Sequence, residues 1–390
     1  MSWENWSGRV TASPSKIVPV ATEADVVAAI QEAVDAGRRI RAVGAGHSHS
    51  PLVATDATLI DPTALSGVVG IDSTRCEALV LAGTRISDLG HPLRDAGFAM
   101  KNQGDIDRQA IAGAVATGTH GTGTTLQNIS ASVSAVRLVL ASGDVVDCDA
   151  THESDLFEVA RLALGAVGIA TKITLAVRGA YKLEEHIWLE DFDDVVDRLD
   201  ELTGATRHFE FFWMPSGRRV ACKRLEETDA PPQYPLASEG RRLAWSYEVL
   251  ATDRPDKHTE MEYSISAEDG PACMRALRDL IRRDFADLEW PLEYRTVAAD
   301  EIWLSMAYGR PTVTLSIHQG IDRDETPLFR ACEAVFREFG GRPHWGKLHY
   351  LRGADLAGRY EHWEDWWRIR DRYDPAGVFL NDYLESLRSD

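Results

Sequence analysis

The chain has 390 residues, 44% of them hydrophobic and 26% charged, a length that suits two domains rather than one core. The sequence contains 42 Lys and Arg residues and 61 Asp and Glu residues, and the formal charge of -19 disfavours nucleic acid and anionic lipid as partners. No apolar run approaches the roughly 20 residues of a membrane span, so we expect no membrane insertion and a small-molecule partner.

The N-terminus and the cysteines indicate the compartment. The first ten residues, MSWENWSGRV, lack the basic segment and the long apolar stretch of a secretory signal. The five cysteines are scattered and form no C-x-x-C pair, which argues against a disulfide framework and against a zinc site. We expect a cytoplasmic protein with reduced thiols and no metal.

The first predicted helix lies in ATEADVVAAIQEAVDAG, residues 21–37. Thr22 and Asp25 have the spacing of a capping box, and Gly37 stands where a helix would stop. The apolar residues at helical spacing are Val27, Ile30 and Val34. A strand over residues 40–43 and a glycine loop follow.

Further strands are predicted in the runs ATLIDP, EALVLAG, VRLVLASGDVVDC and IATKITLAV, with little helix between some of them. From about residue 180, aromatic runs such as HFEFFWMP, HTEMEYSI, PLEYRTV and TVTLSIHQG alternate with the amphipathic segments PACMRALRDLIRRDF and PLFRACEAVFREFG. A Pro-rich, charged segment between residues 224 and 255 predicts a loop, at least in its first half. The pattern indicates two α+β domains.

Two glycine-rich stretches are candidates for cofactor binding. VGAGHSHS, residues 43–50, follows a predicted strand, and small residues there would let backbone N–H groups approach a phosphate. It does not complete the Rossmann or the P-loop fingerprint. AIAGAVATGTHGTGTTLQNIS, residues 110–130, could wrap a dinucleotide with backbone and hydroxyl donors, or could be a loop of structural use.

Together these stretches resemble the vanillyl-alcohol-oxidase (PCMH) type of FAD-linked oxidoreductase, specifically its sugar-1,4-lactone and alditol oxidase branch. The resemblance extends over nearly the whole chain through RAVGAGHS, NQGDIDRQAIAGAVATGTHGTG, LGAVGIATKITL, and RPHWGKLHY with DPAGVFLNDYL. It implies a two-domain α+β fold with an FAD-binding domain over residues 1–178, a cap or substrate domain over 179–348, and a C-terminal segment, 349–390, that returns to the FAD domain.

The resemblance implies that His47, directly after the second glycine of the loop, binds FAD covalently, and that this attachment strengthens the flavin as an oxidant. His49 is the rival, because on an extended segment it would share a face with His47. The other residues that the resemblance implies for cofactor binding are Val43, Gly44, Ala45, Gly46, Ser48, Ser50, Gly113, Thr117, Gly118, His120, Gly121, Gly123, Gly168, Ile169 and Asn381.

Glu293 and Arg295 are two residues apart in PLEYRTV, so in a strand both point to one face. Such a pair can bind a polyol, because the carboxylate accepts hydrogen bonds from hydroxyl groups and the guanidinium donates them. The alternative is an ion pair on the protein surface. The resemblance assigns the pair to substrate binding and catalysis.

The resemblance also makes Lys347 a catalytic residue that stabilises negative charge on the reduced flavin or orients the substrate hydroxyl. His318 in LSIHQG becomes a possible base towards the reacting hydroxyl, with a packed strand histidine as the alternative. Glu260 in HTEMEY is a further candidate for substrate binding, with a solvated carboxylate as the alternative.

The implied reaction is hydride transfer from a carbinol carbon to the flavin, with O2 as acceptor and H2O2 as product. Gly104 matches the family's oxygen gatekeeper, where glycine favours an oxidase. Asp105 is a substrate-binding candidate that stands where alditol oxidases have serine, which favours an aldono-1,4-lactone of the L-gulono, L-galactono or D-arabinono type. The alternatives are an alditol oxidase for xylitol or sorbitol, and a lactone dehydrogenase. The segment 212–259 is shorter than is typical of the family, which leaves the breadth of the substrate pocket open.

Overall fold

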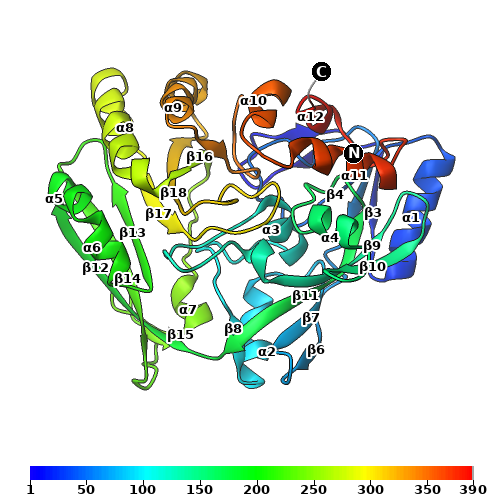
Figure 1. The fold of residues 1–390 in the computed structure, drawn as a ribbon, viewed down its shortest axis with the longest axis horizontal. Helices are drawn as coiled ribbons and strands as arrows, with labels where there is room; N and C mark the ends of the chain where they lie inside the picture. Colours follow the sequence, from blue (N-terminus) through cyan, green and yellow to red (C-terminus); the bar gives the residue numbers. More distant parts are fainter. Residues whose placement is uncertain (389–390) are drawn as a thin grey trace.

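Two layered parts lie side by side in the computed structural model, which describes residues 1–388 (Figure 1). The strands of the N-terminal part are β1 (Trp3–Glu4), β2 (Thr11–Ala12), β3 (Lys16–Pro19), β4 (Ile40–Ala42), β5 (Thr58–Asp61), β6 (Val68–Asp72), β7 (Glu77–Leu81), β8 (Phe98–Met100), β9 (Val133–Val139), β10 (Val145–Asp149) and β11 (Ile169–Gly179). They form a hairpin, β1-β2, a parallel sheet, β3-β5-β4, and an antiparallel sheet, β10-β9-β11-β7-β6, with β8 also paired to β11.

The helices of this part are α1 (Glu23–Asp35), α2 (Ser87–Asp95), α3 (Ile111–Thr117) and α4 (Ser154–Ala160), with the 3-10 turn η1 (Ile129–Ser132). Helix α1 begins at the predicted capping box of Thr22 and Asp25 and ends before Gly37, whose φ is +62°. Of the predicted apolar face, Ile30 is confirmed, whereas Val27 is half-buried and Val34 exposed, and their neighbours Val26 and Ala33 are buried instead. The buried residues of the helix are Val26, Ala29, Ile30 and Ala33.

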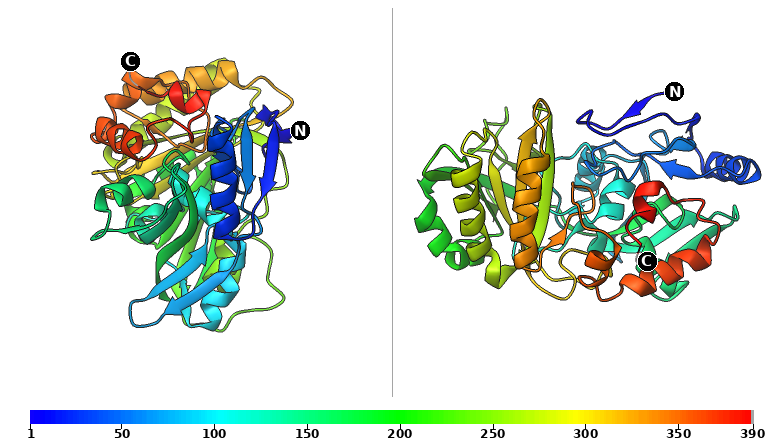
Figure 2. Two further views of the ribbon diagram at one scale, coloured as in Figure 1. Left: turned by 90° about the vertical axis from the view of Figure 1, so that its right-hand side faces the viewer. Right: turned by 90° about the horizontal axis from the view of Figure 1, so that it is seen from above.

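The second part is one eight-stranded sheet with all of its helices but one on the same face (Figures 1 and 2); the exception, Ser246–Leu250, packs on the opposite face against Leu183 and Leu225. Its strands are β12 (Lys182–Asp191), β13 (His208–Trp213), β14 (Arg219–Thr228), β15 (Leu243–Trp245), β16 (His258–Ser266), β17 (Leu292–Val297), β18 (Thr312–Gly320) and β19 (Arg342–Pro343). They pair in the order β15-β12-β14-β13-β17-β18-β16-β19. Its helices are α5 (Phe192–Asp197), α6 (Leu199–Gly204), α7 (Ser246–Leu250), α8 (Gly270–Asp284) and α9 (Thr326–Glu338), with the 3-10 turn η2 (Ala267–Asp269).

The period of two along these strands separates apolar from polar side chains. One set of alternate positions joins the core of helices α8 and α9, as Met261, Tyr294 and Leu315 show. The intervening positions carry buried polar groups, among them Glu260, Glu262, Glu293, Arg295 and His318. One face of the sheet is therefore chemically polar although it is buried.

Of the C-terminal helices, α11 (Trp363–Tyr373) and α12 (Asp382–Glu385) lie against the N-terminal part, whereas α10 (Gly353–Ala357) lies beside α9, whose Arg337 pairs with Asp355 (Figure 1). The Ile40 amide donates to the Val378 carbonyl at 2.8 Å, and the Arg41 guanidinium donates to the Phe379 carbonyl at 2.5 Å. The Trp366 indole donates to the Leu162 carbonyl at 3.3 Å. The last strand of the eight-stranded sheet is thus followed by a segment that contacts the N-terminal part of the chain.

The predicted loop between residues 224 and 255 is wrong at its start, where 224–228 belong to β14; it is irregular over 229–242, and its second half contains β15 and α7. Within residues 1–388, no helix combines the length and the apolar character that crossing a membrane requires.

Candidate active site

A cavity with about 1220 Å³ of space lies between the glycine loop, helix α3 and strand β11. It brings together eleven of the residues predicted to bind the cofactor: Val43, Gly44, Ala45, Gly46, His47, Ser48, Ser50, Gly113, Thr117, Gly168 and Ile169. Within the described chain, the amides of residues 44–48 donate to no protein acceptor. Five consecutive free N–H groups at a cavity wall form an anion-binding concavity of the kind that holds phosphate.

Two glycines keep this cavity open. Gly113 lies in α3, and a Cβ placed on it would meet no atom within 4 Å, so any side chain there would project into free space. A Cβ on Gly44 would lie 2.9 Å from the Ala110 Cβ, too close for the two segments to keep their contact. Glycine at both positions preserves the shape of the cavity.

The remaining residues predicted to bind the cofactor lie outside this cavity. Gly118 ends α3 with a φ of +70°, and the Gly123 amide donates to the Thr296 carbonyl at 2.8 Å. A Cβ on Gly121 would lie 2.3 Å from the Gln103 carbonyl oxygen. Asn381 caps α12 and donates to the carbonyls of residues 51, 52 and 54. The structure gives these four residues positions that hold the backbone around the cavity rather than positions in its wall.

His47 and His49 occupy different environments. His47 lines both the large cavity and the polar space beside it, and the indole of Trp6 stacks on its ring at 5.6 Å. Burial, reinforced by the charge of Lys347, lowers the pKa of His47 to about 4, so its imidazole is neutral at pH 7. His49 lines only the polar space, with its Nε2 3.8 Å from a Glu260 oxygen. Only His47 reaches the large cavity.

The polar cavity collects the residues predicted for catalysis and substrate binding. It is lined by Gly104, Asp105, Glu260, Glu293, Arg295, His318 and Lys347, together with His120, which was predicted on the cofactor side. The polar cavity adjoins the large one, since Gln109 lines both, and His47 lines the large cavity and a third space that shares Gln109, Glu260 and Lys347 with the polar cavity. Side chains from the eight-stranded sheet, from the N-terminal loops at 104–109 and 119–120, and from the HWGK turn therefore converge on one space.

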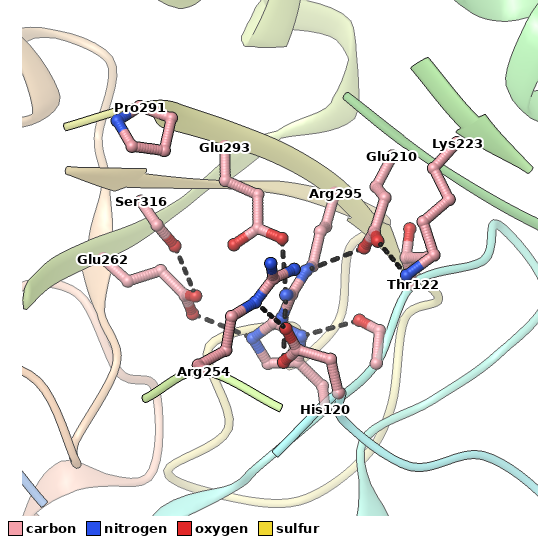
Figure 3. Close-up of polar contacts among 12 residues, drawn as sticks. His120, Thr122, Glu210, Lys223, Arg254, Glu262, Pro291, Glu293, Arg295 and Ser316 are labelled. Atoms are coloured by element: carbon pink, nitrogen blue, oxygen red, sulfur yellow. Dashed lines mark hydrogen bonds and ion pairs between the residues drawn. The ribbon is translucent and has the colours of Figure 1, made fainter. Parts of the chain in front are cut away.

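Glu293 and Arg295 are buried and in contact on β17, with Glu293 Oε1 2.5 Å from Arg295 Nη2 (Figure 3). Asp105 Oδ1 lies 3.2 Å from the same Nη2, and Glu210 Oε2 accepts from Arg295 Nε at 3.1 Å. Burial raises the pKa of Glu293 to about 8, helped by the charges of Glu210, Asp105 and Glu260 and opposed by Arg295. The pair is a buried one and not the surface alternative.

Glu260 is the centre of a second cluster. Its carboxylate is paired with the ammonium of Lys347 and lies 3.8 Å from the Nε2 atoms of His49, His258 and His318. Burial alone would raise the pKa of Glu260, but the charge of Lys347 and the neighbouring imidazoles lower it well below its usual value. Glu260 is therefore an ionised carboxylate inside the polar cavity.

The tautomer of His318 follows from its contacts. Its Nδ1 lies 2.9 Å from the carbonyl oxygen of Pro291, which can only accept, so Nδ1 carries the proton. Burial lowers the pKa of His318 to about 4, and the neutral ring therefore presents an unprotonated Nε2 on the Glu260 side. This nitrogen can accept a proton.

His120 and Glu262 form a third buried contact, 2.8 Å between His120 Nε2 and Glu262 Oε1 (Figure 3). His120 Nδ1 lies 2.8 Å from the Gly121 carbonyl oxygen, and the Ser316 hydroxyl donates to Glu262 at 2.8 Å. Burial would raise the pKa of Glu262, but the His120 contact lowers it below its usual range. His120 is held in the wall of the polar cavity.

Several site residues were not predicted from the sequence. Glu210 and Lys223 lie beside Arg295, Arg254 Nε lies 3.5 Å from Asp105, and His258 and His344 line the polar cavity. His344 stands in the HWGK segment, where only Lys347 was singled out. The alternation of polar and apolar residues in HTEMEYSI and at the start of HFEFFW is the signal that could have indicated His258 and Glu210, whereas no such local pattern indicates Lys223 or Arg254.

The residues present fit FAD. The free amides of residues 44–48 suit the pyrophosphate, the open face at Gly113 leaves room for a flat group, and the other walls are largely apolar. Residues 14–149 match the family model described as an FAD binding domain. The protein is thus a flavoprotein, and FAD is its cofactor.

The chain belongs to the D-arabinono-1,4-lactone oxidase family, whose model matches residues 173–244 and 236–387. It is 35% identical to an L-gulono-1,4-lactone dehydrogenase of Mycobacterium tuberculosis, over 99% of this chain and 98% of that protein. It is 29% identical to an alditol oxidase of a Streptomyces species, over 98% of both chains. It is 24% identical to the L-gulonolactone oxidase of Mus musculus, over 99% and 98% of the two chains. The resemblance seen in the sequence is confirmed.

Solved structures confirm the predicted fold class. A cholesterol oxidase from Brevibacterium sterolicum matches with a TM-score of 0.88 at 14% identity, over 100% of this chain and 96% of that one. A 6-hydroxy-D-nicotine oxidase from Arthrobacter nicotinovorans matches with a TM-score of 0.76 at 16% identity, over 97% and 94%. At these identities the likeness concerns the fold.

Proposed function

We propose that this protein oxidises a carbinol group of an aldono-1,4-lactone, of the L-gulono, L-galactono or D-arabinono type, with O2 as acceptor and H2O2 as product. The observation that carries the proposal is the convergence of Glu293, Arg295, Lys347 and His318 on one cavity that adjoins the FAD cavity at Gln109. The family and the names of the relatives supply the substrate class.

Bound FAD supplies the two-electron acceptor that takes the hydride of the carbinol carbon. Arg295 donates to substrate hydroxyls and Glu293 accepts from them, because both line the cavity from one strand face. Lys347 orients the reacting hydroxyl, and His318 Nε2 accepts its proton. The Glu260 carboxylate, 3.8 Å from that nitrogen, stabilises the imidazolium that forms.

The choice of lactone over alditol rests on Asp105, which lies 3.2 Å from Arg295 and contributes a charged carboxyl group to the cavity. The choice of O2 rests on Gly104, whose added Cβ would press on the His120 carbonyl oxygen at 3.2 Å in the wall of the same cavity. A side chain at this position would crowd the wall of the cavity, and the proposal takes the glycine there as the feature that favours an oxidase.

Two further candidates each have an observation in their favour. The relative at 35% identity is named a dehydrogenase, which favours an acceptor other than O2. The relative at 29% identity is named an alditol oxidase, which favours open-chain polyols such as xylitol or sorbitol. Both candidates keep the same residues in the same roles.

Steady-state assays separate the three. We expect H2O2 release at the rate of lactone consumption with an aldonolactone in air. Turnover of lactones only with an artificial dye acceptor would show a dehydrogenase, and turnover of xylitol or sorbitol but no lactone would show an alditol oxidase. Absence of turnover with every compound and acceptor would contradict the proposal.

We further propose that FAD is attached covalently through His47. In support, His47 alone of the two loop histidines lines the FAD cavity, and its neutral imidazole is a competent nucleophile. Acid-precipitated wild-type protein should retain its yellow colour, His47→Ala should release it, and His49→Ala should keep it. Release of all flavin from the wild-type precipitate would exclude the linkage.

In this proposal, residues 1–178 and 349–390 form the FAD-binding domain and residues 179–348 the cap. The contacts of Val378 and Phe379 with residues 40 and 41 support the return of the C-terminal segment. We also place the protein in the cytoplasm, since all five cysteines are free and four of them are buried.

A further inference from the structure

Three charged residues lie in one row across the cap sheet. Glu210 on β13 is the direct register partner of Lys223 on β14 and of Arg295 on β17. Directly opposite residues of neighbouring strands point to the same face of a sheet. The row therefore runs cation, anion, cation, and all three side chains are buried.

The two oxygens of Glu210 are divided between the two cations (Figure 3). Oε1 lies 3.1 Å from Lys223 Nζ, and Oε2 accepts from Arg295 Nε at 3.1 Å. Lys223 also faces Glu185 at 3.7 Å and Glu239 at 3.8 Å, both farther away than Glu210. Because Nε of Arg295 is taken by Glu210, its Nη2 remains for Glu293 and Asp105.

Glu210 and Lys223 do not line the polar cavity in which we place the substrate. They line a smaller space beside it, and Asp105 and Arg295 border both spaces. The guanidinium of Arg295 therefore lies between the substrate cavity and the Glu210 carboxylate. The contact of Nε with Glu210 fixes the orientation in which Nη2 lies at Glu293 and Asp105.

We propose that Glu210 and Lys223 are positioning residues, which hold the Arg295 guanidinium at the substrate cavity without touching the substrate. The inference rests on the proposed function, in which Arg295 binds substrate hydroxyls. Lys223 acts one step further away, because it fixes the carboxylate that fixes Arg295. Arg–carboxylate contacts of this kind add geometric specificity as well as attraction.

The test compares the holoenzyme variants Glu210→Gln, Lys223→Met and the double variant. The double variant removes one negative and one positive charge together, which limits the cost of leaving a buried charge uncompensated. Glu227→Gln is the matched control, because Glu227 lies on the same strand as Lys223 but pairs with Arg178 and Arg207 outside the cavity. Flavin content, measured from the absorbance ratio, should be unchanged in all four.

With an aldonolactone as substrate, we expect KM to rise about tenfold or more in the three variants and to stay unchanged in the control. The pH profile of kcat/KM is a second readout, which a purely structural role of Glu210 would leave unchanged. Glu293 faces Arg295, Asp105, Glu210 and Glu260, so removing the charge of Glu210 should lower the apparent pKa that Glu293 contributes. A KM and a pH profile equal to those of the control would overturn the proposal.

Failure of the proposed function is recognised separately, by a wild-type enzyme that oxidises no sugar derivative. The positioning role is then decided by the crystal structure of the Glu210→Gln holoenzyme. We expect the Arg295 guanidinium to have moved away from residue 210, because its Nε has lost a carboxylate partner and Lys223 has lost its counter-charge, and an unmoved Arg295 would overturn the inference.

Discussion

At the scale of single residues, the polar cavity depends on where each proton resides. Glu293 is buried beside three other carboxyl groups, so its pKa is raised to about 8 although Arg295 is in contact with it. His318 is buried beside one ionised carboxylate, and its pKa is lowered to about 4. At pH 7 both groups are therefore mostly neutral, and the strongest fixed charges facing the substrate are those of Arg295, Lys347, Glu260 and Asp105.

Glu293→Gln should abolish the rise of kcat/KM with pH on the alkaline side of the pH profile. Only the ionised carboxylate accepts a charge-assisted hydrogen bond from a substrate hydroxyl, so wild-type kcat/KM should rise through a pKa of about 8. The glutamine variant resembles the neutral acid and should show no such limb, with kcat/KM about tenfold below the wild-type value at pH 9. Initial rates between pH 6 and 10 measure this. An identical limb in the variant would assign the titration to another group.

His318→Ala should lower kcat by roughly 10²- to 10⁴-fold, the contribution typical of a positioned base. KM should change little, because His318 is assigned to proton transfer and not to binding the other hydroxyl groups of the substrate. His91→Ala, at an exposed histidine of helix α2, is the control. A rise in KM with kcat unchanged would show that His318 is a packed binding residue instead.

At the scale of elements, α3 combines a structural and a cofactor role in seven residues. Its buried side chains, among them Ile111, Ala114 and Val115, face the core, and Gly113 faces the FAD cavity. The sequence predicted the cavity side because small residues gathered there, whereas the roles of Gly118 and Gly123 in ending and turning the chain depend on tertiary contacts.

Gly113→Val should abolish FAD binding, because the added side chain would enter the space that the flavin needs. The ratio of flavin to protein absorbance after purification measures the loss. Gly204→Val in α6, where a Cβ also meets no atom within 4 Å, is the matched control and should keep its flavin. Full flavin content in Gly113→Val would show that the cofactor lies elsewhere.

The strands of the cap show how far a sequence can predict a site. The i, i+2 spacing of Glu293 and Arg295 places both side chains on one face whatever the neighbouring strands are, and this expectation agrees with the structure. Glu210 and Lys223 join them only because β13 and β14 pair in one particular register, which no local pattern specifies. Similarly, Val26 and Val27 are both apolar, so the pattern alone could not decide which one faces the core.

At the scale of the whole molecule, many buried histidines are neutral. The histidines whose pKa is lowered to about 3 or 4 are His47, His208, His318, His344 and His349. Burial is the main cause for each of them. Two carboxyl groups act in the opposite sense, since burial raises the pKa of Glu293 to about 8 and that of Asp300 to about 6.

The free energy of unfolding should therefore fall as the pH drops from about 6.5 to 4. In that window the histidines are protonated in the unfolded chain and neutral in the folded one. Each of them therefore lowers the free energy of unfolding by about 1.4 kcal/mol per pH unit as the pH falls. The two raised carboxyl groups offset part of this, so we expect a net uptake of about three protons on unfolding near pH 5. Urea unfolding at pH 5 and pH 6.5 measures the difference. Equal stability at the two pH values would contradict the assigned protonation states.

The most direct test of the central claim is the visible spectrum of the anaerobic holoenzyme mixed with L-gulono-1,4-lactone, L-galactono-1,4-lactone and D-arabinono-1,4-lactone in turn. The account predicts that at least one lactone bleaches the flavin, that air restores the colour rapidly, and that Arg295→Met bleaches at least tenfold more slowly at the same lactone concentration. A wild-type flavin that no lactone bleaches, or an Arg295→Met variant that bleaches as fast as the wild type, would contradict it.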